Sequence, residues 1–384
     1  MPVTSYLKNN CSHDGNNFGE MAHSEPSRDP APAFTDWIWD RSVTGVPRRR
    51  RQLQIVLALL WLLDAGLQAQ PYMFGTRFAK QVIEGAAPGN PNVLKQPMMS
   101  MAHLILRHPA IWNSGFVAAQ LLLALGLLWR PTIKAALAAS VGWSLLVWWF
   151  GEGAGGVFSG MTPVMGYPGA VLLYALVALY LWPRKRASAS VATGSALGRT
   201  APKVIWLVLW ASFVRFLLLS DNRSPQGLKT AVSSSAGGEP GWEKLIDNGL
   251  AGALSHHGTE VSVLLAVLCA FVAVAVVMPR RWLVQAGLVL AVVAAVAFWV
   301  AQDFGGLFTG HGTDPNTGPL LILLAATMWP VAVSRPNAHR RREGDRLPGV
   351  GRVDVDPESP GPGEGDLEVV LEVVPRAGVG QRDR

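Results

Sequence analysis

The chain has 384 residues, of which half are hydrophobic and only 15% are charged, and its formal net charge is +7. A soluble globular domain carries about 25% charged residues, so this composition excludes an ordinary soluble domain and indicates that lipid is the main solvent. Because no soluble module is visible to present a basic face, we interpret the positive charge as membrane topology and contact with anionic lipid, and we expect no nucleic-acid binding.

The predicted elements are mostly membrane-spanning helices. The first segment, 1–47, is polar, lacks the apolar core of a cleaved signal peptide, and is expected to be a disordered tail. Eight apolar runs follow, each close to the ~20 residues that a helix needs to cross a hydrocarbon core of ~30 Å. The runs do not alternate polar with apolar residues, which favours helices over a barrel. They cover 52–71, 113–130, 132–150, 168–183, 203–220, 260–278, 282–301 and 318–334.

The basic residues predict the orientation of these helices. Cytoplasmic loops are enriched in Lys and Arg, and here the basic clusters fall on one side of the predicted spans. These clusters include Arg48, Arg49, Arg50 and Arg51 before the first span and Arg340, Arg341 and Arg342 after the last. We therefore expect an eight-pass plasma-membrane protein with both termini in the cytoplasm. The C-terminal segment 336–384, rich in Pro, Gly and Glu, is expected to be a second disordered tail.

A glycine-rich corner occurs twice in the chain. The stretch "WFGEGAGGVFSG" begins at Trp149, and "WVAQDFGGLFTG" begins at Trp299. With a two-residue insertion in the second copy, Pro163 then aligns with Pro315. This pattern indicates two four-helix repeats, 48–186 and 203–335, joined by a cytoplasmic linker at 187–202. Since each unit crosses an even number of times, the two repeats are predicted to be parallel.

The repeat also carries a family resemblance. Its stretches "WWFGEGAGGVF" and "PGAVLLYAL" resemble a family of uncharacterised multi-pass membrane proteins of actinobacteria, over roughly 50–184 and 203–334. The four-helix unit, with an amphipathic outer segment after its first helix, is similar to DoxX-type membrane proteins. The first resemblance implies no particular activity. The second admits a membrane redox component or enzyme, and neither transfers functional residues.

Two charged residues are predicted to lie inside the membrane. Asp64 and Arg215 occupy similar depths in the first helix of each repeat, where an unpaired charge costs about 2.5–3.5 kcal/mol. One interpretation is an ion pair that joins the two halves. The alternatives are a polar site for a substrate or proton, and an Arg215 that extends alone to the interface. The polar residues expected near such a site, all towards the outer face, are Gln68, Gln120, Glu152, Gln302 and Asp303.

Soft metal ligands gather in the predicted outer loops. The stretch "MMSMAH" places thioethers and an imidazole together, which would suit Cu(I). The residues concerned are Met98, Met99, Met101, His103 and His108, with His256 and His257 in the second half. The alternative is an amphipathic helix on the bilayer surface, whose Met and Leu side chains face lipid. We favour this second interpretation and predict no cofactor, with copper as the alternative.

Other chemistry finds little support in the sequence. The stretch "GEGAGG" lacks the preceding strand and the lysine of a nucleotide-binding loop, and no nucleophile motif is present. Cys11 and Cys269 cannot form a disulfide framework. We therefore predict a non-enzymatic membrane protein that binds or moves a small molecule, lipid or ion between its halves. A structural or accessory subunit, within a homo-oligomer or a membrane complex, and a DoxX-like redox protein are the alternatives.

Overall fold

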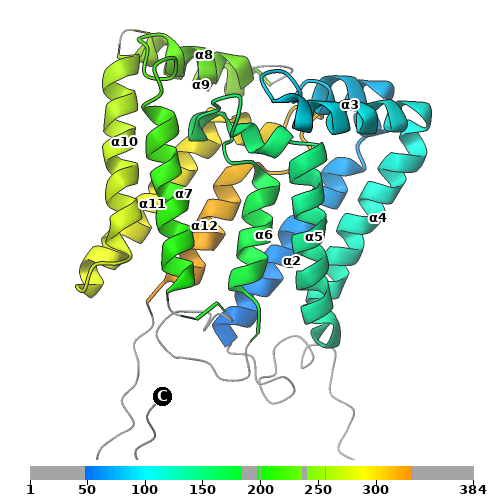
Figure 1. Cartoon of the computed structure of the whole chain (residues 1–384), viewed down its shortest axis with the longest axis horizontal. Helices are drawn as coiled ribbons and strands as arrows, with labels where there is room; N and C mark the ends of the chain where they lie inside the picture. Colours follow the sequence, from blue (N-terminus) through cyan, green and yellow to red (C-terminus); the bar gives the residue numbers. More distant parts are fainter. Residues whose placement is uncertain (1–47, 184–196, 199, 236–239, 256, 331–384) are drawn as a thin grey trace, which may run out of the picture. The chain divides into compact units, whose positions relative to one another are not determined.

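The computed structural model describes residues 48–183, 197–198, 200–235, 240–255 and 257–330, and every regular element assigned within these ranges is helical (Figure 1). The predicted tails 1–47 and 336–384 and most of the predicted linker lie outside them. The long helices are α2 (Arg48–Gln68), α4 (Pro109–Leu128), α5 (Ile133–Phe150), α6 (Ala170–Tyr180), α7 (Ala201–Leu217), α10 (Gly258–Ala275), α11 (Arg281–Ala301) and α12 (Thr317–Met328).

Three further helices lie across one end of the long ones: α3 (Asn92–Arg107), α8 (Gly227–Ser235) and α9 (Gly241–Leu254) (Figure 1). Helical turns complete the described chain: η1 (Pro71–Phe74), η2 (Phe78–Ile83), η3 (Arg130–Thr132), η4 (Gly153–Gly156), η5 (Pro163–Met165) and η6 (Asp303–Gly306). The apolar face of α3 packs against the protein, with Met98, Ala102 and Ile105 buried, and not against lipid as the sequence predicts for its Met and Leu side chains.

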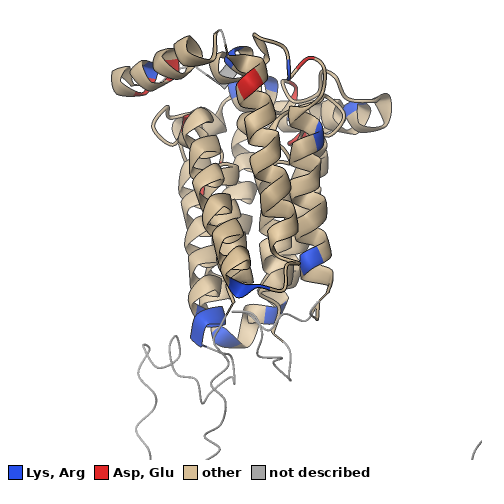
Figure 2. Ribbon diagram, turned by 90° about the vertical axis from the view of Figure 1, so that its left-hand side faces the viewer, with Lys and Arg blue, Asp and Glu red and all other residues tan. Residues whose placement is uncertain are grey.

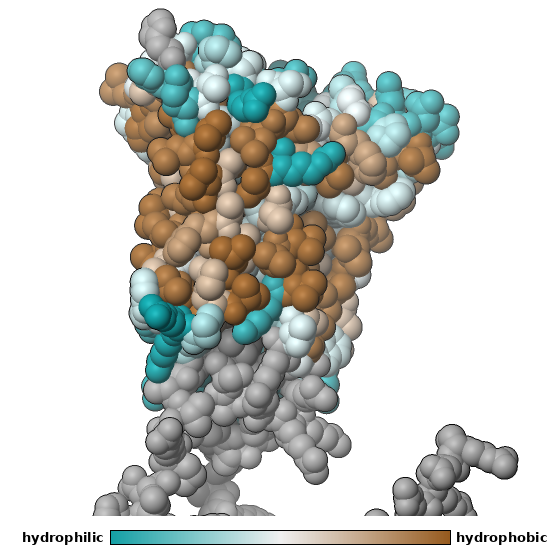
Figure 3. All heavy atoms as spheres, turned by 60° about the vertical axis from the view of Figure 1, so that its left-hand side comes forward, coloured by the Kyte–Doolittle hydropathy of each residue, from teal (hydrophilic) through white to brown (hydrophobic). Residues whose placement is uncertain are grey.

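Among the described residues, four helices are long and apolar enough to cross a membrane: Pro109–Leu128, Arg130–Phe150, Gly258–Ala275 and Arg281–Ala301. Their outward side chains are apolar, and Leu122 and Val267 expose 68% and 62% of their surface. Figure 3 shows the resulting hydrophobic band between two hydrophilic ends. At the end where α2 begins, the charged residues are Lys and Arg, whereas the opposite end carries both signs (Figure 2). This distribution fits a bundle of helices surrounded by lipid.

Helices α6 and α12 are shorter than the apolar runs 168–183 and 318–334 from which they were predicted. They have 11 and 12 residues, so each is about 16–18 Å long and cannot cross the hydrocarbon core alone. Most of their side chains are buried, because α6 packs against α5 and α12, and α12 also packs against α11 and α2. Irregular backbone at their ends is therefore enclosed by protein, which is where a membrane protein tolerates it.

Part of the basic cluster in the first turn of α2 has a structural role in addition to marking an end of the bundle. The Arg51 guanidinium donates hydrogen bonds from Nη1 to the Leu127 carbonyl at 2.8 Å and from Nη2 to the Leu128 carbonyl. One turn later, Gln54 donates from Nε2 to the Leu181 carbonyl at 3.1 Å. These side chains satisfy carbonyl groups at the C-terminal ends of α4 and α6, which have no partner within their own helices.

The helix pairs α4–α5 and α10–α11 approach closely at glycine–alanine contacts. A Cβ atom added to Gly126 in α4 would lie 3.0 Å from the Cβ of Ala136 in α5. In the second pair the roles are exchanged, and a Cβ at Gly287 in α11 would overlap the Cβ of Ala275 in α10. Small residues at such contacts let helix backbones pack closely in a membrane.

We expect Gly287→Ala to destabilise the protein, because overpacking a tight contact costs about 1–3 kcal/mol. The measurement is the Tm of the detergent-purified protein, which should fall by several degrees. Gly142→Ala is the matched control, since a Cβ at Gly142 in α5 meets nothing within 4 Å. That variant should keep or raise the Tm because alanine is the better helix former. Equal effects of the two substitutions would contradict the close α10–α11 contact.

Candidate functional site

A cavity of about 330 Å³ lies among α2, α3, α4 and α5, at the end of the bundle that α3 covers. Its walls come from both predicted halves, because Thr313 and Asp314 of the segment between α11 and α12 reach it. The volume is at the lower end of the range for small-molecule pockets. We refer to this space as the carboxylate cavity, after the acidic residues in its lining.

Three carboxylates, Asp64, Glu152 and Asp314, line the carboxylate cavity, and none of the described Lys or Arg residues lines it. Asp64 comes from α2 and is 1% exposed, whereas Glu152 follows α5 and Asp314 precedes α12. The charge of Asp314 acts on the carboxyl groups of both other residues. The cavity is therefore electronegative, and the repulsion disfavours ionisation of all three groups at once.

Glu152 is held at the N-terminus of α6. The Val171 backbone N–H faces its Oε1 atom at 3.5 Å, and its buried Oε2 atom has no hydrogen-bond partner among the described residues. A Cβ at Gly169 would overlap Oε2, so only glycine at this position lets the carboxyl group come so close to the chain. Burial, followed by the charge of Asp314, raises the pKa of the Glu152 carboxyl well above its ordinary value of 4.5.

Asp314 is oriented by its own loop. Its carboxylate accepts a hydrogen bond from the Asn316 backbone N–H at 2.7 Å and another from the Thr313 hydroxyl at 3.0 Å. Burial nevertheless raises the pKa of Asp314 above its ordinary value. The loop thus fixes an acidic group of the second half on the wall of a cavity whose other acids belong to the first half.

Several buried polar atoms of the lining have no hydrogen-bond partner within the described part of the chain. They are Oδ1 of Asp64, Oε1 of Gln120, Nε1 of Trp143 and Oε2 of Glu152. The Tyr174 hydroxyl lies beside Asp64 but outside hydrogen-bond geometry. A buried polar group without a partner costs about 1–3 kcal/mol. Their concentration in one cavity indicates a place where a polar ligand makes the missing contacts.

One wall of the carboxylate cavity is aromatic. The Phe116 ring lies at the centre of this wall, with centroid distances of 6.4 Å to Phe78, 6.2 Å to Trp112 and 5.9 Å to Trp143. All four rings belong to the cavity lining. Aromatic faces attract cations by about 0.5–2 kcal/mol, so this wall and the carboxylates both favour a positively charged ligand.

The structure brings together four of the polar residues singled out in the sequence: Asp64, Gln68, Gln120 and Glu152 all line the carboxylate cavity. Gln302 lies elsewhere, at a contact between the predicted halves. It donates from Nε2 to the Pro163 carbonyl at 2.7 Å and accepts from the Thr317 hydroxyl at 3.1 Å. Asp303 is buried in the second half and is also absent from the cavity lining.

The predicted ion pair between Asp64 and Arg215 is not formed among the described residues. The Arg215 side chain is exposed, and its guanidinium lies 5.1 Å from the centroid of the Phe216 ring. The reason is rotational. When the buried tryptophans Trp61 and Trp210 are aligned, Asp64 corresponds to Phe213, and Arg215 lies two residues further along the helix. Two residues turn a helix by about 200°, so Arg215 points to a different face.

The predicted soft-ligand cluster separates on the two sides of α3. Met98 is buried and Met101 lines the carboxylate cavity, whereas Met99 is partly buried and His103 and His108 are exposed. His257 is exposed, and His256 lies outside the described residues. Within the described ranges, no group of three His, Cys, Asp or Glu residues is arranged to hold a metal ion. Copper binding by the methionines stays a prediction.

Sequence reasoning missed Asp314 and the aromatic wall. A signal for Asp314 was present, because Thr313 and Asp314 immediately precede Pro315, where the second corner has two more residues than the first. An insertion that places an acidic residue in only one of two repeated corners predicts that the two corners have different roles. The aromatic wall had no such signal, since membrane helices commonly carry Trp and Phe at their ends.

We expect Glu152→Gln to change how stability depends on pH. Because the pKa of Glu152 is raised in the folded state, the folded protein binds more protons than the unfolded chain above pH 4.5, and stability falls as pH rises. Glutamine removes this loss. The Tm of E152Q should match wild type near pH 4.5 and exceed it at pH 8. Glu84→Gln, at a partly exposed position, is the control and should follow wild type throughout. Parallel curves for E152Q and wild type would contradict the raised pKa.

Comparisons with known proteins identify no relative of this chain. No family model, curated protein or solved structure matches the chain. The resemblances to the actinobacterial membrane family and to DoxX-type proteins therefore stay predictions. The function has to be inferred from the geometry and charge of the carboxylate cavity.

Proposed function

We propose that this protein is a multi-pass membrane protein that binds a hydrophobic organic cation of the ammonium class in the carboxylate cavity. The observation that carries the proposal is the convergence of Asp64, Glu152 and Asp314 on one cavity that has an aromatic wall and no basic residue among the described residues that line it. A substituted ammonium group would counter the charge of these carboxylates by ion contact, and its positive head would face Oδ1 of Asp64 and Oε2 of Glu152, which have no hydrogen-bond partner among the described residues.

An organic cation fits this cavity better than a bare metal ion does. Calcium and magnesium require several oxygen ligands within about 2.0–2.6 Å. The described residues offer no group of three acidic, His or Cys side chains arranged for this purpose. An ammonium ion with organic substituents can instead contact carboxylates that lie apart, while its substituents cover the rings of Trp112, Phe116 and Trp143.

The proposed setting is a plasma-membrane protein of eight crossings, made of two parallel four-helix units with both termini in the cytoplasm. Repeated contacts support the two units. Asn113 of α4 donates to the Gln68 carbonyl at 2.9 Å, and 149 residues later (262 − 113 = 149) Ser262 of α10 donates to the Leu217 carbonyl at 2.6 Å. The two acceptors are separated by the same interval (217 − 68 = 149).

Backbone conformation supports the same correspondence. Ala154 adopts φ 57° and ψ 34° in the first corner, and Phe304 adopts φ 51° and ψ 26° in the second. Non-glycine residues rarely occupy this left-handed region. In both cases the following residue is a glycine with positive φ, Gly155 or Gly305. Such a conformation at the same place in both corners is expected of copies of one unit.

The orientation can be tested with cysteines and a membrane-impermeant maleimide applied to intact cells. Cys11 should react only after the cells are permeabilised, because the N-terminal tail is proposed to be cytoplasmic. A cysteine introduced as Lys95→Cys, on the exposed face of α3, should react from outside. Cys269 is buried and serves as the unreactive control. Labelling of Cys11 in intact cells would reverse the proposed orientation.

Cation binding can be tested with benzyltrimethylammonium and protein in lipid nanodiscs, by titration calorimetry. We expect Asp64→Asn to weaken binding by roughly 10-fold to 100-fold, since close pairs of opposite charge in a binding site couple by about 1.5 kcal/mol or more. Affinity should rise from pH 5 to pH 8, because protons compete with the cation for Glu152, whose pKa is raised.

Two controls accompany this titration. Glu84→Gln removes a carboxylate that is not in the cavity lining and should bind as wild type does. Neopentylbenzene, the neutral carbon isostere of the probe, should bind far more weakly. Equal binding of the charged and neutral compounds, or unchanged affinity in Asp64→Asn, would overturn the proposed recognition of a cation.

A further inference from the structure

We propose that the cation is the head of an amphiphile whose single hydrocarbon chain lies in a groove between α4 and α5. This inference rests on the proposed function, because it takes the ammonium head to occupy the carboxylate cavity. It adds the class of ligand, which is a long-chain alkylammonium compound rather than a small polar amine. It also assigns the position of the chain on the surface of the bundle.

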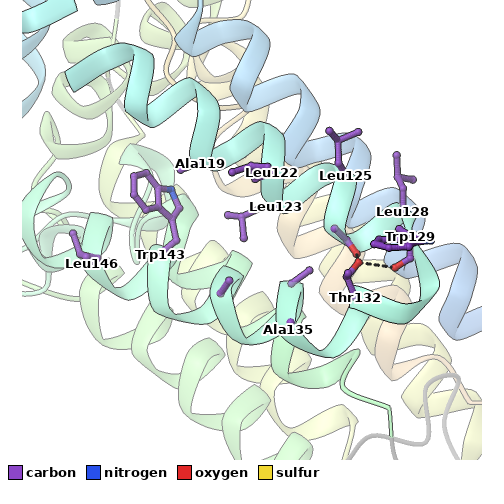
Figure 4. A pocket seen from close by; sticks show the side chains of 13 residues that line it. Ala119, Leu122, Leu123, Leu125, Leu128, Trp129, Thr132, Ala135, Trp143 and Leu146 are labelled. Atoms are coloured by element: carbon purple, nitrogen blue, oxygen red, sulfur yellow. Dashed lines mark hydrogen bonds between the residues drawn. The ribbon is translucent and has the colours of Figure 1, made fainter. Parts of the chain in front are cut away.

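The groove, which we call the α4–α5 groove, has a volume of about 870 Å³ and is lined by apolar side chains (Figure 4). Its polar side-chain atoms are the Thr132 hydroxyl and the indole nitrogens of Trp129 and Trp143, and the Thr132 hydroxyl has partners within the chain. It already donates to the Gly126 carbonyl at 2.7 Å and lies 2.9 Å from the Trp129 carbonyl. Both helices are among the four that can cross a membrane, so the groove opens towards lipid. These properties suit a hydrocarbon chain.

The groove adjoins the carboxylate cavity. Trp143 and Leu146 line both spaces. In Figure 4 these two residues lie towards one end of the groove, and Trp129 and Thr132 lie towards the other. The helix rises by about 20 Å between Thr132 and Leu146, so the groove accommodates an extended chain of considerable length. A head at Asp64 and a chain along α5 can therefore belong to one molecule.

Small residues create the groove. Gly126 and Ala136 bring α4 and α5 together at its floor, and Ala135 and Ala139 leave space along α5. Because lipid chains are as apolar as the groove, transfer of a chain from bilayer to groove releases little free energy. Specific occupancy must then come from the head. The carboxylates supply that attraction, which identifies a cationic amphiphile as the occupant rather than any membrane lipid.

The test uses a hexadecyltrimethylammonium probe with a photoactivatable diazirine near the end of its chain. Wild-type protein in nanodiscs is irradiated with the probe, and labelled residues are mapped by mass spectrometry. We expect labelling to concentrate on α4 and α5 around Trp129 and Ala135, and an excess of benzyltrimethylammonium to suppress it at least several-fold. Ala139→Trp, which fills the groove, should abolish this labelling.

Ala138→Trp is the matched control, because Ala138 is exposed on the same helix but does not line the groove. It should be labelled as wild type is. Both tryptophan variants should still bind benzyltrimethylammonium, which shows that each is folded and that the head site is intact. Label spread evenly over the lipid-facing helices, or groove labelling that the short cation does not reduce, would overturn the chain assignment.

The outcomes separate this inference from the proposed function. Normal benzyltrimethylammonium binding with dispersed label refutes the chain assignment alone. Failure of wild type to bind benzyltrimethylammonium refutes the proposed function itself. An Ala135→Cys, Ala139→Cys double variant that forms a covalent dimer, insensitive to the probe, would assign the groove to a second copy of the chain and likewise overturn the proposal.

Discussion

The burial of two short helices at the centre of the bundle is the constraint on which the rest of the structure depends. Neither α6 nor α12 is long enough to cross a hydrocarbon core, so the segments that precede them must be enclosed by protein. Those segments find partners in the opposite half. The η5 turn packs against α7, α8 and α11, and Asn222 donates to the Gly160 carbonyl at 2.8 Å. In return, the segment before α12 brings Asp314 to the carboxylate cavity.

The two halves use equivalent positions differently. With Trp61 and Trp210 aligned, the buried acid Asp64 corresponds to Phe213, which lies 5.9 Å from Tyr167 and 6.2 Å from Phe298 between ring centroids. In the second half, aromatic side chains therefore pack around the position that faces the carboxylate cavity in the first half. On the proposed duplication, one copy of the unit has kept or gained a polar site and the other has become a packed core.

The membrane helices and part of the site could be predicted from sequence. The apolar runs predicted helices because an uninterrupted apolar stretch of about 20 residues is typical of a helix that crosses a membrane. Asp64 and Glu152 stood out because acids are rare beside such runs. The short lengths of α6 and α12 could not be predicted, since apolar composition does not distinguish lipid from a protein interior as surroundings. The orientation of Arg215 could not be predicted either, because similar depth in the membrane does not determine which face of the helix a residue occupies. Arg215 lies two residues after the position equivalent to Asp64, and this offset turns it to another face.

Because Asp314 lies in the second half of the chain, the carboxylate cavity is complete only after both halves have been synthesised. During synthesis the first half is made before the second, so Asp64 and Glu152 enter the membrane while the segment that bears Asp314 has yet to be translated. Until that segment arrives, one wall of the cavity is missing and its electronegative character is weaker. On the proposed function, capture of a cation would therefore be delayed until both halves have assembled, and an incomplete or truncated chain would not sequester the ligand.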